Sequence, residues 1–235
     1  MMPVRRSLMT ILTFALALAA PTPREHGITD VAHADDSTGV VSPGGEMRMP
    51  PPSPADDPDS GVELLGAPPP PFAFTRWVRG PALTLAQLRG KVVLVRFWTE
   101  ECHFCRATLP ALETVRRRDA ARGLIVIGAF HPNEPGTHRS DAHIRHAAEE
   151  LGFDGPIACD EQWRTLQAWW LDGHPERNWV SCSFLIGRDG RVRWVHGGGE
   201  YHPSNDPRHH RCDLQFAGFE QALAAALDEP APAAR

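Results

Sequence analysis

The fold is decided by the stretch KVVLVRFWTEECHFC, residues 91–105. Its first half contains residues 92–98, a mostly apolar and β-branched run that is typical of a strand buried in a sheet. Its second half ends in two cysteines, Cys102 and Cys105, separated by two residues. Apolar side chains continue beyond Cys105 at helical spacing, so the sequence places the cysteine pair between a buried strand and the start of a helix.

The segments that follow continue the alternation of strand and helix. The run LIVIGAF, residues 124–130, predicts a second buried strand, and a strand–helix–strand unit of this kind crosses over right-handed. Residues 183–186 and 191–195 flank the turn GRDG, which predicts an antiparallel hairpin. Apolar stripes predict further helices at residues 141–151, 160–171 and 216–227. We therefore expect an α/β fold with a mixed central sheet and flanking helices.

The position of the cysteine pair favours redox chemistry. A thiolate at a helix N-terminus faces unpaired backbone N–H groups and the positive end of the helix dipole, which lower its pKa. We therefore predict that Cys102 is the attacking nucleophile and that Cys105, one turn further on, resolves the mixed disulfide. His103 is a third predicted site residue, because its protonated ring would further stabilise the Cys102 thiolate. A CxxC motif also serves as half of many zinc sites, but the sequence contains no second CxxC.

Several short motifs surround the pair, namely GAP (66–68), LAQLRGK (85–91), FWT (97–99), TLP (108–110), VIG (126–128) and FLIGRDG (184–190). With these motifs the chain resembles the thioredoxin-like superfamily in its exported branch, over about residues 64–228. It looks most similar to periplasmic domains that accompany electron-transfer membrane proteins of the cytochrome-c-biogenesis type. The resemblance implies a thioredoxin-like fold, dithiol–disulfide exchange with protein thiols and disulfides, and a membrane electron donor as a further partner. It implies no cofactor.

Three positions depart from that family pattern. Ser181 stands where members usually have a cis-proline, and since a cis bond before a non-proline residue costs about 3 kcal/mol, we expect a trans bond and an altered loop. Arg96 replaces a buried acid that thioredoxins often carry, so a proton acceptor would have to come from Glu100 or Glu101. Glu101 also replaces a tryptophan, and its charge beside Cys102 opposes thiolate formation. The alternative for both glutamates is a solvated loop.

Five cysteines are an odd number, so at least one stays unpaired within a monomer. Cys159 follows an apolar run and is interpreted as a buried, inert thiol. Cys182 could pair with Cys212 or Cys159, or pass electrons to the CxxC motif, and the spacing does not choose between these alternatives.

A histidine-rich segment near the C-terminus contains five side chains of metal-binding type within eleven residues, namely His202, Asp206, His209, His210 and Cys212. Imidazole, carboxylate and thiolate groups together could bind zinc or copper. Their spacing matches no recognised ligand motif, however. The sequence therefore favours a polar surface loop here, and we predict no metal site.

The first third of the chain differs in composition from the rest. Two arginines precede an apolar run at residues 8–20, which predicts a signal peptide over residues 1–20, with a retained anchor as the alternative. Residues 21–65 are proline-rich with few large apolar side chains, which predicts a disordered linker. A thioredoxin-like domain is then expected over residues 66–230. This organisation predicts a periplasmic or otherwise extracytoplasmic protein without a stable membrane span after processing.

Other functions are weighed against thiol–disulfide exchange. A net charge of −5 offers no electrostatic reason to bind nucleic acid. A copper or zinc chaperone on the same fold would use Cys102, Cys105 and a histidine. A peroxiredoxin-like peroxidase is suggested by Thr99, three residues before Cys102, but the proline of that motif is replaced by Val95. A non-catalytic binding module is the remaining alternative.

Overall fold

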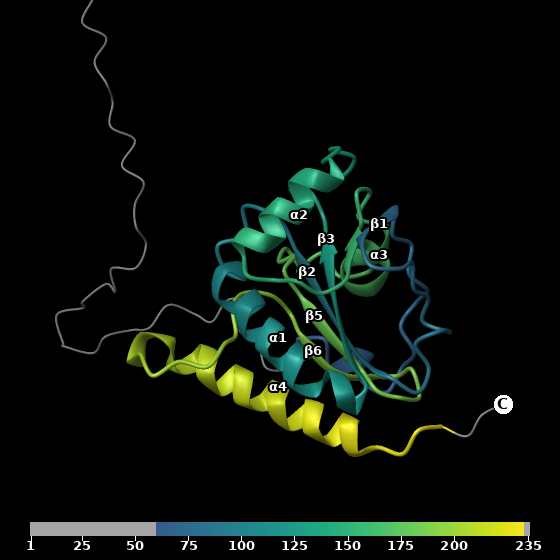
Figure 1. The fold of residues 1–235 in the computed structure, drawn as a ribbon, viewed down its shortest axis with the longest axis vertical. Coiled ribbons are helices and arrows are strands. Elements are labelled where there is room, and N and C mark those ends of the chain that lie inside the picture. Colours follow the sequence, from purple (N-terminus) through teal and green to yellow (C-terminus); the bar gives the residue numbers. More distant parts are fainter. Residues whose placement is uncertain (1–59, 233–235) are drawn as a thin grey trace, which may run out of the picture. The chain divides into compact units, whose positions relative to one another are not determined.

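Six strands form one mixed sheet within residues 60–232, the part of the chain that the computed structural model describes (Figure 1). Their order across the sheet is β1-β4-β3-β2-β5-β6. Strands β2, β3 and β4 are parallel, whereas β1, β5 and β6 each run antiparallel to their neighbours. The bounds are β1 Arg76–Arg79, β2 Val92–Trp98, β3 Leu124–Phe130, β4 Ile157–Cys159, β5 Ser183–Ile186 and β6 Val192–His196.

Helices cover both faces of this sheet. One face carries α1 (Cys105–Asp119), α2 (Asp141–Glu150) and α4 (His210–Asp228), and Figure 1 shows α1 and α4 lying side by side. The other face carries α3 (Arg164–Leu166), which continues as the π-helix η4 (Gln167–Leu171). Short 3₁₀ turns are η2 (Val62–Leu64), η3 (Ala120–Arg122) and η5 (Pro207–His209).

Strand β2 lies at the centre of the core because all seven of its side chains are buried. Successive side chains of a strand point to opposite faces. Leu94 and Trp98 accordingly pack in the cluster with α1, α2 and α4, while Val95 and Phe97 pack with Trp169 on the opposite face. The carboxyl end of this strand therefore emerges from a rigid centre and positions whatever follows it.

Most of the predicted elements are confirmed. The two buried strands, the hairpin and the helix at residues 141–150 lie where the sequence pattern puts them. The helix predicted from Asp160 begins only at Arg164, because the Asp160 carboxylate accepts the backbone N–H groups of Thr165 and Leu166 at 3.2 and 2.8 Å. Helix α4 begins at His210, six residues before the apolar stripe that predicted it. The sequence pattern missed this start because the first turns of the helix carry mostly polar side chains.

Two strands had no signal in the sequence. Strand β4 has only three residues, and β1 has the sequence RWVR, in which arginines alternate with apolar side chains. Both strands are short, and β1 lies at the edge of the sheet. Pairing with a neighbour rather than an intrinsic preference therefore makes them strands.

The predicted signal peptide lies outside the described residues, as does most of the predicted linker. The end of that linker is structured, since Leu64 packs against the sheet and Glu63 pairs with Arg177. The Gly66 amide also donates to the Val192 carbonyl of β6 at 2.8 Å. Ordered structure thus begins before the boundary expected at residue 66. Within residues 60–232, no helix has the length and apolar character needed to cross a membrane.

Candidate active site

Cys102 and Cys105 form a disulfide between the carboxyl end of β2 and the first residue of α1, with their Cα atoms 5.2 Å apart. Cys102 is partly exposed, whereas Cys105 is completely buried. A partner sulfur can therefore approach Cys102 but not Cys105. The order of attack, in which Cys102 reacts first, stays a prediction.

The start of α1 provides a positive electrostatic environment for the pair. No side chain caps this helix at Phe104, so the positive end of its dipole faces the two cysteines. The Cys105 amide donates to the Cys102 carbonyl at 3.1 Å, which closes the turn that holds both sulfurs. The sequence predicted this placement, and the structure agrees with it.

Arg96 is the main feature of the site that sequence reasoning noted but did not place. Its side chain is completely buried on β2, and its Nη2 atom lies 3.8 Å from the Cys105 Sγ atom. The same Nη2 donates to the Gly199 carbonyl at 2.9 Å, and Nη1 donates to the Ser181 carbonyl. Burial lowers the pKa of Arg96, but a guanidinium keeps its proton in proteins. A buried cation therefore lies directly behind the sulfur of Cys105.

Residues 199–201 connect the region after β6 to this site. The Gly199 amide donates to the Ser181 hydroxyl at 3.3 Å, and the Tyr201 amide donates to the Thr108 hydroxyl of α1 at 3.1 Å. The Thr108 hydroxyl in turn donates to the Phe104 carbonyl at 3.1 Å. No cis peptide bond occurs in the described part of the chain, so the bond before Ser181 is trans, as expected. Backbone contacts from three segments thus converge around Cys105.

The predicted site residues beside the pair lie at its rim. His103 is exposed, and Glu101 is exposed and accepts a hydrogen bond from the side chain of Asn133. Glu100 is held more tightly, by Arg139 Nε at 2.7 Å and by the Thr99 hydroxyl at 3.0 Å. Neither carboxylate makes a hydrogen bond to either sulfur of the pair within residues 60–232.

Glu100 has the electrostatics of a paired surface acid. Burial alone would raise its pKa, but the hydrogen bonds from Arg139, its own backbone amide and Thr99 outweigh that effect and lower the pKa below its usual value. Glu100 is therefore ionised near neutral pH. Its position gives it a role in holding the loop that carries Glu101 and Cys102.

His131 is a buried titratable residue that sequence reasoning missed. It follows β3 at the same edge of the sheet as the cysteine pair, and its amide donates to the Trp98 carbonyl of β2 at 2.9 Å. Burial lowers the pKa of His131 to about 4, although its Nδ1 atom donates to the Pro132 carbonyl at 3.0 Å. The ring is therefore neutral at pH 7. Its position at the carboxyl end of a parallel strand was the available signal.

The AhpC/TSA family model matches residues 65–195, more than half of the chain and a range that contains the cysteine pair, Arg96 and Ser181. The chain belongs to the AhpC/TSA family. The match ends before residues 199–212, so the segment after β6 and the start of α4 lie beyond the part that this AhpC/TSA member shares with the family model.

Curated relatives of this AhpC/TSA family member share short stretches with it. Protein DipZ of Mycobacterium bovis is 31% identical over 144 residues, which cover 60% of this chain and 20% of DipZ. Thiol-disulfide oxidoreductase ResA of Halalkalibacterium halodurans is 25% identical over 122 residues, or 52% of this chain and 62% of ResA. The chain thus spans less than two thirds of the length of these relatives.

Solved structures confirm the predicted thioredoxin-like fold of this family member. A putative thiol:disulfide interchange protein DsbE from Chlorobium tepidum is similar with a TM-score of 0.52 and 23% identity, covering 69% of this chain and 97% of that one. A thioredoxin-like protein in its oxidised form is similar with a TM-score of 0.53 and 21% identity, covering 70% and 99%. At these identities the likeness concerns the fold.

The three remaining cysteines of this AhpC/TSA member are all buried and unpaired, so neither pairing considered for Cys182 is found. Burial raises the pKa of the Cys159 thiol to about 11 and that of the Cys182 thiol to about 12. Both thiols therefore stay protonated at neutral pH and have little nucleophilic character. Cys159 is the buried thiol that the sequence predicts.

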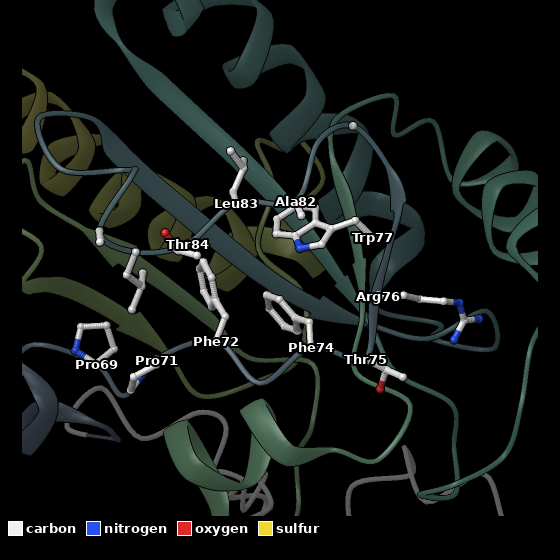
Figure 2. Close-up of a pocket in the computed structure, with 13 residues that line it drawn as sticks. Pro69, Pro71, Phe72, Phe74, Thr75, Arg76, Trp77, Ala82, Leu83 and Thr84 are labelled. Carbon is white, nitrogen blue, oxygen red and sulfur yellow. The ribbon is translucent and has the colours of Figure 1, made fainter.

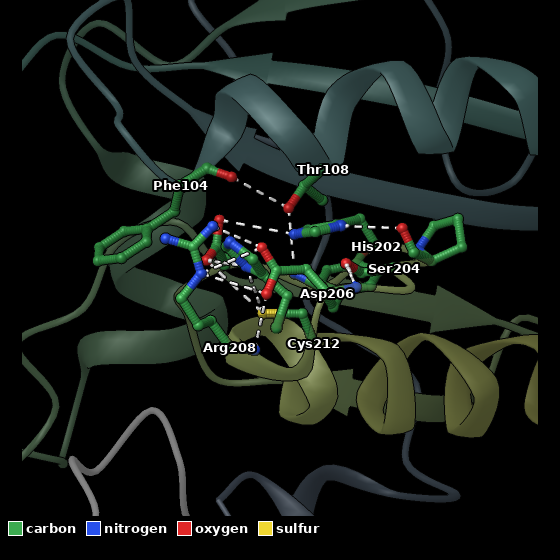
Figure 3. A network of polar contacts seen from close by, with 11 residues as sticks. Phe104, Thr108, His202, Ser204, Asp206, Arg208 and Cys212 are labelled. Atoms are coloured by element: carbon green, nitrogen blue, oxygen red, sulfur yellow. Dashed lines mark hydrogen bonds and ion pairs between the residues drawn. The ribbon is translucent and has the colours of Figure 1, made fainter.

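Cys212 has different neighbours from the other two. Four side chains, Glu200, His202, His209 and Cys212, place one ligand-type atom each within 4.8 Å of the others (Figure 3). Burial and the Glu200 carboxylate raise the pKa of the Cys212 thiol to about 11. The sequence singled out three of these four residues and missed Glu200, which lies outside the histidine-rich segment.

Two residues of the histidine-rich segment do not join this group. Asp206 instead accepts hydrogen bonds from the backbone and guanidinium of Arg208, as Figure 3 shows, and His210 is exposed on the first turn of α4. The bond from the Arg208 amide at 3.0 Å caps the turn η5. The Asp206 carboxylate therefore stabilises the turn that precedes the C-terminal helix.

A separate apolar groove of about 880 Å³ is formed by residues 69–86 (Figure 2). Phe72 stacks on Phe74 and on Trp169, with ring centroids 4.8 and 5.4 Å apart. The guanidinium of Arg76 is held by Asp141 at 2.8 Å and by a second carboxylate. The groove has no cysteine or histidine in its lining, so it offers no reactive group.

Proposed function

We propose that this chain is an exported thiol–disulfide oxidoreductase that exchanges the Cys102–Cys105 pair with the thiols and disulfides of protein substrates. The observation that carries the proposal is the disulfide at the start of α1, with Cys102 partly exposed and Cys105 completely buried. This arrangement lets one sulfur meet a partner while the other is kept for the second step. The name of the relative ResA, a thiol-disulfide oxidoreductase, supports the same chemistry.

The reaction proceeds through a mixed disulfide. In the reduced protein, the Cys102 thiolate attacks one sulfur of a substrate disulfide and releases the other as a thiolate, which takes up a proton. The Cys105 thiolate then attacks Cys102 Sγ, closes the disulfide and releases the second substrate thiol. Two electrons pass from the pair to the substrate, and the reverse sequence oxidises a substrate dithiol.

Arg96 acts on the second of these steps. Its guanidinium lies 3.8 Å from the Cys105 Sγ atom in a fully buried position, where a positive charge favours the thiolate over the thiol. Cys105 thereby becomes an effective resolving nucleophile without a carboxylate to accept its proton. Stabilising the thiolate also stabilises the reduced pair relative to the disulfide, which raises the reduction potential of the couple.

The decisive experiment uses the two cysteines separately. The Cys105→Ser variant should accumulate a mixed disulfide between Cys102 and a disulfide-bonded test protein, because the resolving sulfur is missing. The Cys102→Ser variant should form none, because Cys105 is buried. Intact-mass spectrometry under non-reducing conditions reads both outcomes. If Cys105→Ser forms no adduct while remaining folded, the proposed exchange reaction is refuted.

The peroxidase alternative is tested with the same reduced protein. The Thr99 hydroxyl is engaged by Glu100 and Asn133, at 3.0 and 3.1 Å. We therefore expect no consumption of hydrogen peroxide beyond that of a free thiol. Rapid stoichiometric oxidation of Cys102 by peroxide would favour the peroxidase instead.

Export and partners form a further part of the proposal. The predicted signal peptide over residues 1–20 supports an extracytoplasmic location, and the resemblance to domains that accompany electron-transfer membrane proteins supports a membrane electron donor. N-terminal sequencing of the protein recovered from the extracytoplasmic fraction should find a chain that lacks residues 1–20. A full-length chain confined to the cytoplasm would refute this part.

A further inference from the structure

We propose that Glu200, His202, His209 and Cys212 bind one Zn²⁺ ion, at a site separate from the Cys102–Cys105 pair. Two segments supply the ligands: the loop after β6 carries Glu200 and His202, and the region where η5 leads into α4 carries His209 and Cys212. One atom from each residue lies within 4.8 Å of all the others. Imidazole, thiolate and carboxylate are the three ligand types that zinc uses in proteins.

The distances between these atoms match the edges of a tetrahedral zinc site. With Zn–S of about 2.3 Å and Zn–N or Zn–O of about 2.0–2.1 Å, ligand atoms lie about 3.5 Å apart when one is sulfur and about 3.3 Å apart otherwise. Cys212 Sγ lies 3.6 Å from Glu200 Oε1 and 3.7 Å from His209 Nδ1. His209 Nδ1 lies 3.3 Å from Glu200 Oε1. Three of the four ligands thus already have near-tetrahedral spacing.

His202 supplies an independent observation that points to a metal. Its Nδ1 atom lies 3.1 Å from the Pro203 carbonyl, which can only accept, so Nδ1 carries the proton. In the neutral ring, Nε2 is then a bare lone pair, and this atom is buried without a hydrogen-bond partner among residues 60–232. It lies 3.8 Å from Glu200 Oε2, within the cluster. Histidines that bind metals characteristically donate their other ring N–H to a carbonyl or carboxylate.

Charge and ligand type favour Zn²⁺ over other divalent ions. A Cys212 thiolate and a Glu200 carboxylate together neutralise the charge of the ion, and the two imidazoles are neutral. Magnesium and calcium prefer all-oxygen sites, whereas copper(II) prefers a square-planar arrangement. As the metal–sulfur bond forms, the Cys212 thiol loses its proton to solvent.

Four protein ligands describe a structural rather than a catalytic zinc site. The ion would fasten the start of α4 to the loop after β6, and no side chain caps α4 at that end. The same loop is attached to α1 through the Tyr201 amide and Thr108. Zinc would therefore hold the C-terminal helix against the part of the fold that surrounds Cys105.

The test uses the full chain carrying Cys102→Ser and Cys105→Ser, in which the redox pair has no thiols. Zn²⁺ titrated into this metal-free variant should bind at one equivalent per chain, measured by competition with a chromophoric chelator. Co²⁺ in place of Zn²⁺ should give the visible bands of a tetrahedral ion and a sulfur-to-metal charge-transfer band. Because the redox pair is absent, failure here leaves the exchange reaction unaffected, and the reverse also holds.

Matched variants in the same background identify the ligands. His202→Ala and Cys212→Ser should each weaken zinc binding by at least about 100-fold. Loss of a residue that only hydrogen-bonds to a ligand weakens metal binding by up to about 100-fold, and loss of a ligand itself should cost at least as much. His210→Ala removes an exposed histidine from the same segment and should bind zinc like the parent. Loss of the charge-transfer band in Cys212→Ser, with tetrahedral bands of the parent retained in His210→Ala, is the expected spectroscopic result.

Three outcomes would overturn the proposal. The first is no stoichiometric binding of Zn²⁺ by the parent variant. The second is unchanged affinity in both His202→Ala and Cys212→Ser. The third is a cobalt spectrum without sulfur-to-metal charge transfer. Circular dichroism of each variant establishes that it is folded, and the parent titration decides the question even if a ligand variant does not fold.

Discussion

Two sulfur sites in this chain differ in the charge that lies beside them. Cys105 has the buried guanidinium of Arg96 at 3.8 Å, and the positive end of α1 faces its pair. Cys212 instead has the Glu200 carboxylate at 3.6 Å and two histidines close by. Positive neighbours favour a reactive thiolate, whereas a carboxylate beside a thiol favours a site that a cation completes. Both sites use a cysteine sulfur, so the charged groups beside each sulfur decide whether it favours redox chemistry or metal binding.

The two sites are joined by short connections. Arg96 binds the Gly199 carbonyl, and Thr108 accepts from the Tyr201 amide, so the loop that carries Glu200 is attached on both sides of that residue. Experiments that change one site and monitor the other therefore measure how independent they are.

The largest effect should come from Cys102→Ser, which removes the attacking sulfur. We expect thiol–disulfide exchange to fall by more than about 10³-fold, because the nucleophile forms the covalent intermediate. Turnover of a disulfide-bonded substrate measures this loss. Cys212→Ser is the matched control and should leave exchange within about threefold of the wild-type rate. Equal losses in both variants would contradict the separation of the two sites.

The second effect is that of Arg96→Met, which keeps the length of the side chain and removes its charge. The carbonyls of Ser181 and Gly199 lose their donor, so the free energy of unfolding should fall by about 4 kcal/mol, at about 2 kcal/mol for each buried carbonyl. The reduction potential should become more negative by about 30 mV, since the Cys105 thiolate loses its cation.

Denaturant titration and equilibration with glutathione buffers measure these two quantities. Arg96→Lys is the control, because it keeps the positive charge and should keep most of the potential. A potential that stays at the wild-type value in Arg96→Met would show that the cation does not act on the redox pair.

The third effect is a loss of stability in acid, because protonation of His131 lowers the free energy of unfolding. Its pKa is about 4 in the folded protein and about 6.5 when exposed, so the unfolded chain takes up the proton first as the pH falls. The contribution to stability is complete above about pH 6.5 and is lost towards pH 4, by about 3 kcal/mol in total. Urea titrations at several pH values should show a smaller loss for His131→Gln. His210→Gln, at an exposed site, should keep the wild-type profile.

The smallest effect should come from Thr108→Val, which keeps the shape of the side chain and removes the hydroxyl between the two sites. The Tyr201 amide loses its acceptor, so the free energy of unfolding should fall by about 1–2 kcal/mol. Zinc affinity should also fall severalfold, because Glu200 and His202 flank Tyr201. Thr114→Val removes an exposed hydroxyl from the same helix and is the control. Unchanged zinc affinity in Thr108→Val would indicate that the sites are independent.

Local pattern explains which parts of the fold were predictable. Strand β2 and its partner β3 are continuous apolar runs, and the hairpin has an Asp-Gly turn, so each carries its own signal. Strands β1 and β4 have three or four residues and are strands only because they pair with each other and with β3. The early start of α4 was hidden for a similar reason, because polar residues such as His210 and Asp213 carry no apolar period.

The redox pair was visible in the sequence because its chemistry depends on residues that are neighbours along the chain. A spacing of three residues at the start of a helix brings Cys102 and Cys105 together whatever the rest of the fold does. Arg96 could be identified as unusual, but its contact with Cys105 depends on how β2 lies beneath α1. Contacts between residues 85–103 positions apart, such as those from Arg96 to Ser181 and Gly199, leave no local pattern.

The sequence by itself determined the mixed sheet and the position of the cysteine pair, because these follow from periodicity and short spacing. Only the tertiary structure decided which charges surround each sulfur. It placed a buried cation behind Cys105, and it joined Glu200 and His202 with His209 and Cys212 while leaving Asp206 and His210 outside. The physical reason is that charge and ligand geometry act through space over a few ångströms, whatever the separation along the chain.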